Sequence, residues 1–294
     1  MGVIRQLEPR LGPHNLNQDN ITSIHTPFLL YVENMALISL SLTIGMLMVL
    51  SHVVRGLLRQ VVHGELVRGC LAELVAAAEM VATSYEMSRV FGNHGIIAYS
   101  IILFLTILWR IRTWDGVTAC PYSLLGQYVE KGAQYHHTML KILAQLVGGV
   151  ASIRWVKYMY TIEVMHTHTS GDDIGYCESD IQVPVVMGFL IEGSLTCVCE
   201  LASRALGEIK PKYAAAINSF FVTSMVLVAF NHSGGYFNPV LATCLKWSCR
   251  GHTNTEHIIV YWAGSILGAM LSIKLWNLAT VKKVLVGFFK PKEE

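Results

Sequence analysis

The stretch Ser233-Gly234-Gly235-Tyr236-Phe237-Asn238-Pro239-Val240-Leu241 decides how this chain folds. Two adjacent glycines permit an irregular backbone. Asn is a favoured helix N-cap and Pro a favoured first helical residue, so a helix is predicted to begin at Pro239. Hydrophobic sequence (213–230) leads up to this loop and resumes after it. A helix that begins inside a membrane exposes free N–H groups, which is tolerated only against protein or a water-filled path. The stretch therefore predicts one half of a pore.

The composition places the whole chain in a membrane. Of 294 residues, 53% are hydrophobic and only 14% are charged, which is low for a soluble domain. Seven apolar runs approach the roughly 20 residues that a membrane-spanning helix needs; they are 35–54, 66–87, 95–111, 138–160, 184–206, 213–230 and 256–280. Two further runs, 121–130 and 239–249, are too short to span. We expect an all-α polytopic membrane protein with seven spans and two half-spans.

The charged residues between these runs predict the orientation. Basic residues are in excess in 55–68, 204–212 and 281–294, whereas 161–183 contains five acidic residues and no Lys or Arg. By the positive-inside rule the basic segments lie in the cytosol and the acidic segment in the lumen or outside the cell. Because the basic residues alternate with apolar runs, membrane lipid is an expected partner and nucleic acid is not.

The chain also repeats itself at a nearly constant interval. The segment 72–74, which holds Glu73, pairs with 191–193, which holds Glu192. The segment 115–122 pairs with 233–240, and 146–149 pairs with 266–269. Each half, 66–160 and 184–280, thus contains three spans and one half-helix. An odd number of spans inverts the second half, so the two half-helices should meet with their N-termini near the membrane centre.

This arrangement resembles the aquaporin superfamily, with Asn238-Pro239-Val240 as the second half-helix motif and Cys120-Pro121-Tyr122 as a degenerate first one. The degenerate motif and the additional hydrophobic helix 35–54 are similar to the unorthodox, or subcellular, superaquaporins. The resemblance implies a channel domain over 66–280, preceded by an N-terminal segment 1–65 and followed by a cytosolic tail 281–294. It also implies a homotetramer with one pore per subunit and an intracellular membrane, with the plasma membrane as the alternative.

The two motifs are chemically unequal. The Asn238 side-chain oxygen can cap its helix while the amide N–H groups point into the lumen. Cys120 is a poor cap and a weak donor, and we expect its thiol to face the lumen. Tyr122 stands where the family has a small Ala, so it either narrows the path or fills space beside Cys120.

The resemblance also implies a narrow filter with an Arg three residues after the second-motif Asn. That position is Leu241 here, and the other filter-like positions are Ser100, Val226 and Gly235. This lining is uncharged. We therefore expect passage of water and, in addition, of small neutral solutes such as glycerol or hydrogen peroxide.

Ionisable and small residues within the spans have separate expected roles. Glu73 and Glu192 are either proton-relay carboxylates or acceptors for loop N–H groups, and their matching places favour the second role, that of structural braces. Close helix packing is expected at the small residues, which are Gly148, Gly149, Gly268 and Ala269. Arg110 and Arg112 are expected at the cytosolic mouth, in contact with lipid headgroups.

The remaining reactive residues indicate neither catalysis nor a cofactor. The seven cysteines are irregularly spaced, so we expect buried thiols rather than a disulfide framework. His166 and His168 have no neighbouring Cys, so no metal site is expected, and no nucleophile–base pair indicates an enzyme. Lys290 and Lys292 resemble a dilysine signal for the endoplasmic reticulum, and Asn20 lies in a glycosylation sequon.

Two other functions remain open at this stage. One is a secondary transporter in which Glu73 or Glu192 couples transport to protons. The other is a non-conducting scaffold of the same shape, whose pore is closed by Tyr122 and Leu241.

Overall fold

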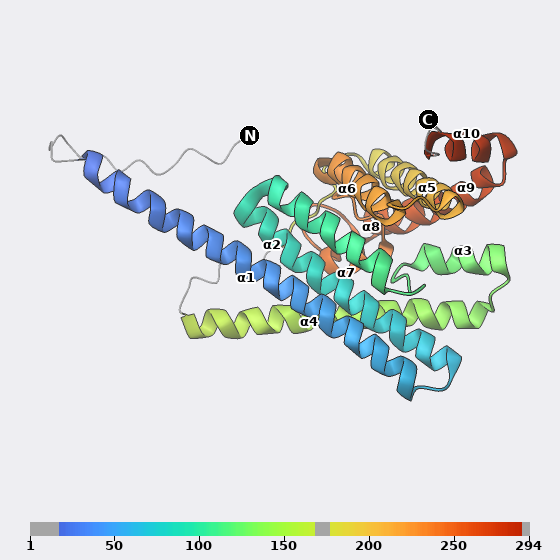
Figure 1. The fold of residues 1–294 in the computed structure, drawn as a ribbon, viewed down its shortest axis with the longest axis horizontal. Coiled ribbons are helices and arrows are strands. Elements are labelled where there is room, and N and C mark those ends of the chain that lie inside the picture. Colours follow the sequence, from blue (N-terminus) through green and yellow to red (C-terminus); the bar gives the residue numbers. More distant parts are fainter. Residues whose placement is uncertain (1–17, 168–176, 290–294) are drawn as a thin grey trace. The chain divides into compact units, whose positions relative to one another are not determined.

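The computed structural model describes residues 18–167 and 177–289, and Figure 1 shows the course of the chain. Its helical elements are α1 (Gln18–Val61), α2 (Glu65–Thr113), α3 (Pro121–Lys131), α4 (Tyr135–Thr167), α5 (Val185–Ile209), α6 (Ala214–Ser233), α7 (Pro239–Lys246), α8 (Asn254–His257), the π-helical η1 (Ile258–Gly264), α9 (Ser265–Trp276) and α10 (Ala279–Phe289). The chain divides into two compact units, residues 1–39 and residues 40–294.

The longest element, α2, is two helices joined by a sharp turn. Gly95 has φ 76° and ψ −175°, a conformation that residues with a Cβ rarely adopt. The helix doubles back at this point into two legs, 65–94 and 96–113 (Figure 1). Among the described residues, six helices are long and apolar enough to cross a membrane, and α2 supplies two crossings. The expected all-α polytopic fold is confirmed, although α1 begins at Gln18, well before the predicted residue 35.

The two halves of the second unit interlock. The third helix of each half packs against the first: α4 lies against α2, while η1 and α9 lie against α5. Each half-helix contacts the third helix of the opposite half, since α3 packs against α9 and α7 packs against α4. The half-helices are therefore held by both repeats.

Glycines set the spacing of the first and third helices in each half. A Cβ on Gly148 would lie 2.8 Å from the Leu74 carbonyl carbon, and one on Gly268 would lie 2.8 Å from the Gly193 carbonyl carbon. Leu74 and Gly193 directly follow the two spanning glutamates. Next to these glycines, Gly149 faces Cys244 and Val240 of α7, and Ala269 is buried. The repeat seen in the sequence is thus a repeat of contacts.

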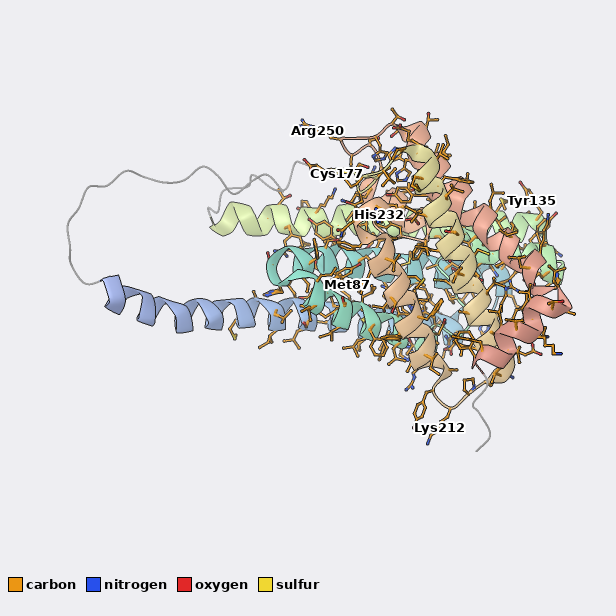
Figure 2. All side chains as sticks on the ribbon, turned by 90° about the horizontal axis from the view of Figure 1, so that it is seen from above. Met87, Tyr135, Cys177, Lys212, His232 and Arg250 are labelled. Carbon is orange, nitrogen blue, oxygen red and sulfur yellow. A yellow bond between two sulfur atoms is a disulfide. The ribbon has the colours of Figure 1, made fainter. Side chains whose placement is uncertain are left out.

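A disulfide joins Cys177, before α5, to Cys249, after α7. The expectation of free thiols was wrong for these two residues, because the fold brings together positions 72 residues apart in the sequence. Backbone hydrogen bonds reinforce the junction, with Arg250 N donating to Cys177 O over 3.0 Å. Figure 2 places Cys177, His232 and Arg250 toward one end of the bundle and Lys212 toward the other.

Some sequence predictions fall on parts that the structure does not describe. Lys290 and Lys292 lie outside the described residues. The side chains of Asn20, His166 and His168 lie outside them as well.

Candidate functional site

Glu73 holds the loop that leads into α3. Its Oε1 accepts from Thr118 N over 3.1 Å and its Oε2 accepts from Ala119 N over 2.8 Å. Gln145 Nε2 on α4 donates to the same Oε2 over 2.8 Å. The Glu73 side chain is buried, at 3% exposure. Both oxygens are therefore engaged by groups of the first half.

Glu192 does the same for the loop that leads into α7. Its Oε1 accepts from Ser233 Oγ over 2.7 Å and from Tyr236 N over 3.3 Å, and its Oε2 accepts from Phe237 N over 2.8 Å. The residue is fully buried. The two loop N–H groups held by each carboxylate stand at equivalent places, immediately before the X-Pro motif.

The backbone of the two loops is equivalent as well. Ala119 and Phe237, directly before the motifs, have positive φ angles of 47° and 45°. Non-glycine residues in this region are strained and are held there by their surroundings. Here the glutamates that bind their N–H groups provide that restraint. Both half-helices then begin at a proline after an extended residue, Cys120 or Asn238.

Asn238 connects the two half-helices. Its Oδ1 caps α7 by accepting from Val240 N over 3.0 Å and Leu241 N over 3.3 Å. Its Nδ2 donates to Ala119 O over 2.9 Å and to Met80 Sδ over 3.3 Å. The expected lumenal donor thus serves mainly to join the two loops, and Asn238 is only 8% exposed.

Cys120 lies immediately before α3. It makes no side-chain cap to α3 and is 6% exposed. It is not among the residues that line the two cavities described below. The lumenal thiol at Cys120 therefore stays a prediction, whereas its neighbour Tyr122 lines the open space.

A cavity of about 360 Å³ lies between the two repeats and is lined by the second half-helix loop, 234–238, and by Tyr122 of α3. Val226, Gly235, Asn238 and Leu241 line it, as the resemblance implied. Ser100 does not; its hydroxyl donates to Ile96 O, and the adjacent Tyr99 lines the cavity instead. One residue along a helix turns a side chain by about 100°, so a prediction good only to a turn cannot separate these two positions.

An aromatic group on the cavity wall escaped prediction. Tyr99 lies 6.1 Å from Phe91 and 5.2 Å from Phe230, between ring centroids, and the two phenylalanines are 4.7 Å apart. All three residues line the cavity, as do Met80 and Met87. Their apolar periodicity is that of any spanning helix, so the sequence carries no signal that separates them from lipid-facing positions.

At the end of the bundle near the disulfide, the cavity is bordered by a polar cluster. Lys246 Nζ lies 2.9 Å from Asp180 Oδ1, and the Tyr236 hydroxyl donates to Asp180 Oδ2 over 2.5 Å. Lys246 Nζ also donates to Glu178 O over 3.0 Å. The charge of Lys246 is therefore matched by a carboxylate.

Tyr122 of α3 also lines this cavity. It also lines a second cavity of about 240 Å³ between α3, α5 and α9. Near this second cavity Arg204 forms a bidentate pair with Glu130, with both N···O distances at 2.8 Å. Tyr122 is thus part of the lining of both cavities.

The prediction that Arg110 contacts lipid headgroups was wrong. It lines the cavity rather than facing headgroups, and its Nη2 donates to Thr83 Oγ1 over 2.6 Å. Its guanidinium carbon lies 5.5 Å from the centre of the Trp114 ring. The leg 96–113 is much shorter than the leg 65–94, so its last turn lies level with the middle of its partner. Arg112, two residues further, is exposed.

Known proteins share both this architecture and parts of the sequence. Aquaporin-11 of Milnesium tardigradum is 26% identical over 214 residues, covering 73% of this chain and 77% of that protein. Putative aquaporin-12A of Homo sapiens is 28% identical and covers 68% of each chain. The X-ray structure of the aquaglyceroporin from Plasmodium falciparum superposes with a TM-score of 0.56 at 13% identity, covering 75% of this chain and all of that one. These matches support membership of the aquaporin superfamily. No family model matches it.

One relative matches almost the whole chain. This relative, human aquaporin-11, is 22% identical but extends over 92% of this chain and 94% of its own length. That match covers more of the chain than the segment 66–280 on which the resemblance was first based. In this chain the second half-helix loop lies beside the cavity, and Asn238 is the only strong amide of the two motifs.

Proposed function

We propose that this protein is a passive channel for water and small neutral solutes such as glycerol and hydrogen peroxide. The observation that carries the proposal is the cavity lined by Asn238, by the second half-helix loop and by Tyr122 of the first half-helix. Water and polyols need hydrogen-bond partners along an otherwise apolar path. The backbone of the second loop, 234–237, and Asn238 provide such partners, and Leu241 leaves the wall uncharged at the filter position.

The bonding of the two glutamates argues against a proton-coupled transporter. A coupling carboxylate must exchange protons with the transport path. Glu73 and Glu192 are buried, absent from the lining of the cavity, and bonded to loop N–H groups. We therefore assign both as structural braces, with Gly148, Gly149, Gly268 and Ala269 as the packing residues.

Tyr122 decides between an open and a closed channel. Since it borders both cavities, it is the side chain that a solute must pass between them. A closed pore, and hence a scaffold role, is the second candidate function, and this same observation favours it. Conduction then requires the Tyr122 ring to move aside.

Stopped-flow measurements on liposomes containing the purified protein distinguish these functions. Wild type is expected to raise water and glycerol permeability above that of empty liposomes, and Tyr122→Ala is expected to raise it several-fold further. Tyr128→Ala is the matched control, because Tyr128 lies on the same half-helix and is 42% exposed. A wild type without permeability combined with a conducting Tyr122→Ala variant would support the scaffold.

The disulfide supports an orientation and a location. Disulfides persist in oxidising compartments, so the end of the bundle with Cys177 and Cys249 is proposed to face a lumen or the cell exterior. This agrees with the positive-inside assignment of the acidic segment 161–183. We further propose an intracellular membrane, in particular the endoplasmic reticulum, and a homotetramer. Microscopy of the tagged chain and native mass spectrometry test these two points.

A further inference from the structure

Among the described residues that line the cavity, Arg110 is a charged side chain for which no ion pair is formed. Leu241 occupies the filter position and packs against an apolar cluster that includes Met80 and Trp114. The Arg110 guanidinium also lies over the Trp114 ring, although Arg110 belongs to α2 and Leu241 to α7. Arg110 thus brings a positive charge to the cavity wall beside Trp114, a residue of the same cluster against which the uncharged Leu241 packs.

The depth of Arg110 follows from its partner Thr83. Met80 contacts Asn238, and Thr83 lies one helical turn from Met80 on the same leg. A turn rises 5.4 Å. The Arg110–Thr83 hydrogen bond of 2.6 Å therefore holds the guanidinium about one turn from the level of Asn238, near the middle of the leg 65–94.

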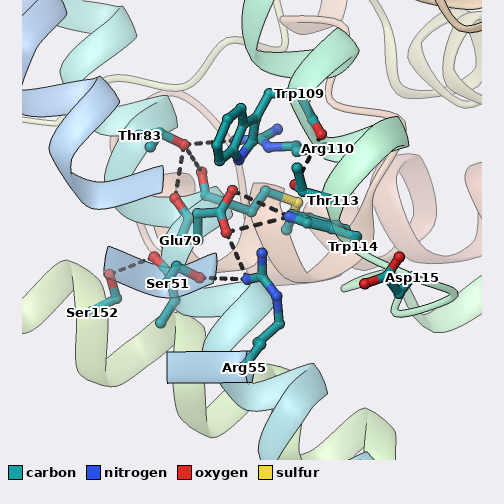
Figure 3. Close-up of polar contacts among 12 residues, drawn as sticks. Ser51, Arg55, Glu79, Thr83, Trp109, Arg110, Thr113, Trp114, Asp115 and Ser152 are labelled. Atoms are coloured by element: carbon teal, nitrogen blue, oxygen red, sulfur yellow. Dashed lines mark hydrogen bonds and ion pairs between the residues drawn. The ribbon is translucent and has the colours of Figure 1, made fainter. Parts of the chain in front are cut away.

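The nearest buried carboxylate is already neutralised by another residue. Glu79 Oε2 lies 2.7 Å from Arg55 Nη1 of α1, in a pair that is almost wholly buried. Trp114 Nε1 donates to both Glu79 oxygens, over 3.2 and 3.3 Å. Within the described residues, no carboxylate lies within ion-pair distance of Arg110. The two arginines and the glutamate together carry a formal net charge of +1, and Figure 3 shows them around Trp114.

We propose that Arg110 is the charge-selective residue of the conduction path. Its positive charge repels cations, a role that the uncharged Leu241 at the filter position does not perform. In the same arrangement Arg55 is a positioning residue, since it neutralises Glu79 and leaves Arg110 unpaired. The additional N-terminal helix α1 thereby contributes to selectivity through Arg55. The positive ends of the two half-helices act in the same direction.

The size of the effect follows from Coulomb's law. At an effective dielectric constant of about 20, a cation passing roughly 6 Å from the guanidinium is repelled strongly enough to slow its passage about 100-fold. A neutral solute is unaffected by the charge itself. Removal of the charge should therefore change cation flux while neutral flux changes little.

The test uses the full-length purified protein in liposomes, with potassium and proton flux and water permeability measured on the same vesicles. Arg110→Met and Arg110→Gln remove the charge, and the Gln amide still offers a donor to Thr83. Arg110→Lys keeps the charge, and Arg112→Met is the control at an exposed site on the same leg. Every variant is also made in the Tyr122→Ala background, so that closure by Tyr122 does not conceal an effect.

The proposal predicts a rise of about 100-fold in cation flux for Arg110→Met and Arg110→Gln, with Arg110→Lys and Arg112→Met close to wild type. It is overturned if the two uncharged variants, monodisperse and helical, pass cations no faster than wild type in either background. The inference rests on the proposed channel function, yet the two fail separately. Absence of water flux in wild type and in Tyr122→Ala refutes the channel, whereas normal water flux with unchanged cation exclusion refutes only the role of Arg110.

Discussion

Substitution of Gly148 or Gly268 by alanine should separate the first and third helices of the corresponding half. An added Cβ on Gly148 would lie 2.8 Å from the carbonyl carbon of Leu74 and 3.0 Å from its Cα. On Gly268 the distances to the same atoms of Gly193 would be 2.8 and 2.9 Å. The neighbour in both cases is backbone, so no side chain can rotate away.

The structure gives the size of the displacement. Carbon atoms in ordinary contact are about 3.5–4.0 Å apart, so the two backbones must move apart by roughly 1 Å. Overpacking of this kind costs about 1–3 kcal/mol of the free energy of unfolding. The same movement would stretch the 2.8 Å bond between Glu73 Oε2 and Ala119 N beyond hydrogen-bond range, since Glu73 directly precedes Leu74. Stability and permeability should therefore fall together.

Thermal unfolding in detergent, followed by circular dichroism, measures the first effect. We expect the unfolding temperature to fall by about 2–12 °C for each variant, because 1 kcal/mol corresponds to about 2–4 °C in a chain of this size. Gly207→Ala on α5 is the control: its Cβ would meet nothing within 4 Å, and replacing a helical glycine there should be neutral or slightly stabilising. Unchanged melting of both Gly148→Ala and Gly268→Ala would refute the close approach on which the argument depends.

Three further predictions concern the loops and the half-helices. Glu192→Gln replaces one carboxylate oxygen by an amide NH₂ group, which cannot accept from the loop N–H groups. The unfolding free energy measured in detergent should therefore fall by about 2 kcal/mol. Replacing Cys177 and Cys249 together by Ser removes a cross-link between residues 72 positions apart. The unfolding free energy in the same assay should then fall by about 4 kcal/mol. An unchanged value would mean that the disulfide does not restrain the unfolded chain. The hydrogen bond from Arg204 lowers the pKa of Glu130, so the folded state binds fewer protons than the unfolded state near pH 4. Stability should then decline as the pH falls below about 5, and a melting series should show a weaker decline in Glu130→Gln.

The parts of the fold that could be predicted are those with local causes. Pro121 and Pro239 mark helix starts because a proline lacks the N–H that a first turn leaves free. The places of Glu73 and Glu192 followed from the repeat, since two charged residues at matching depths need matching partners. These signals do not depend on how distant segments pack.

The parts that could not be predicted depend on the phase and ends of the helices. Whether Ser100 or Tyr99 meets the cavity is a question of helix rotation, which packing decides. Arg110 looked like a basic residue at a helix end, and only the short second leg of α2 places that end inside the bundle. The pairing of Cys177 with Cys249 depends on the tertiary fold of the second half, which brings together residues 72 positions apart. Cys120 occupies the place in the first half that Asn238 occupies in the second. Unlike Asn238, it makes no side-chain cap to its half-helix and does not line the cavity.

The most direct test of the central claim is the water and glycerol permeability of liposomes that contain the purified chain, measured by stopped-flow light scattering with and without a proton gradient. A passive channel predicts permeability above empty vesicles that does not saturate with solute, ignores the proton gradient and rises in Tyr122→Ala. Permeability equal to that of empty vesicles in both wild type and Tyr122→Ala, or flux that saturates and follows the proton gradient, would contradict it.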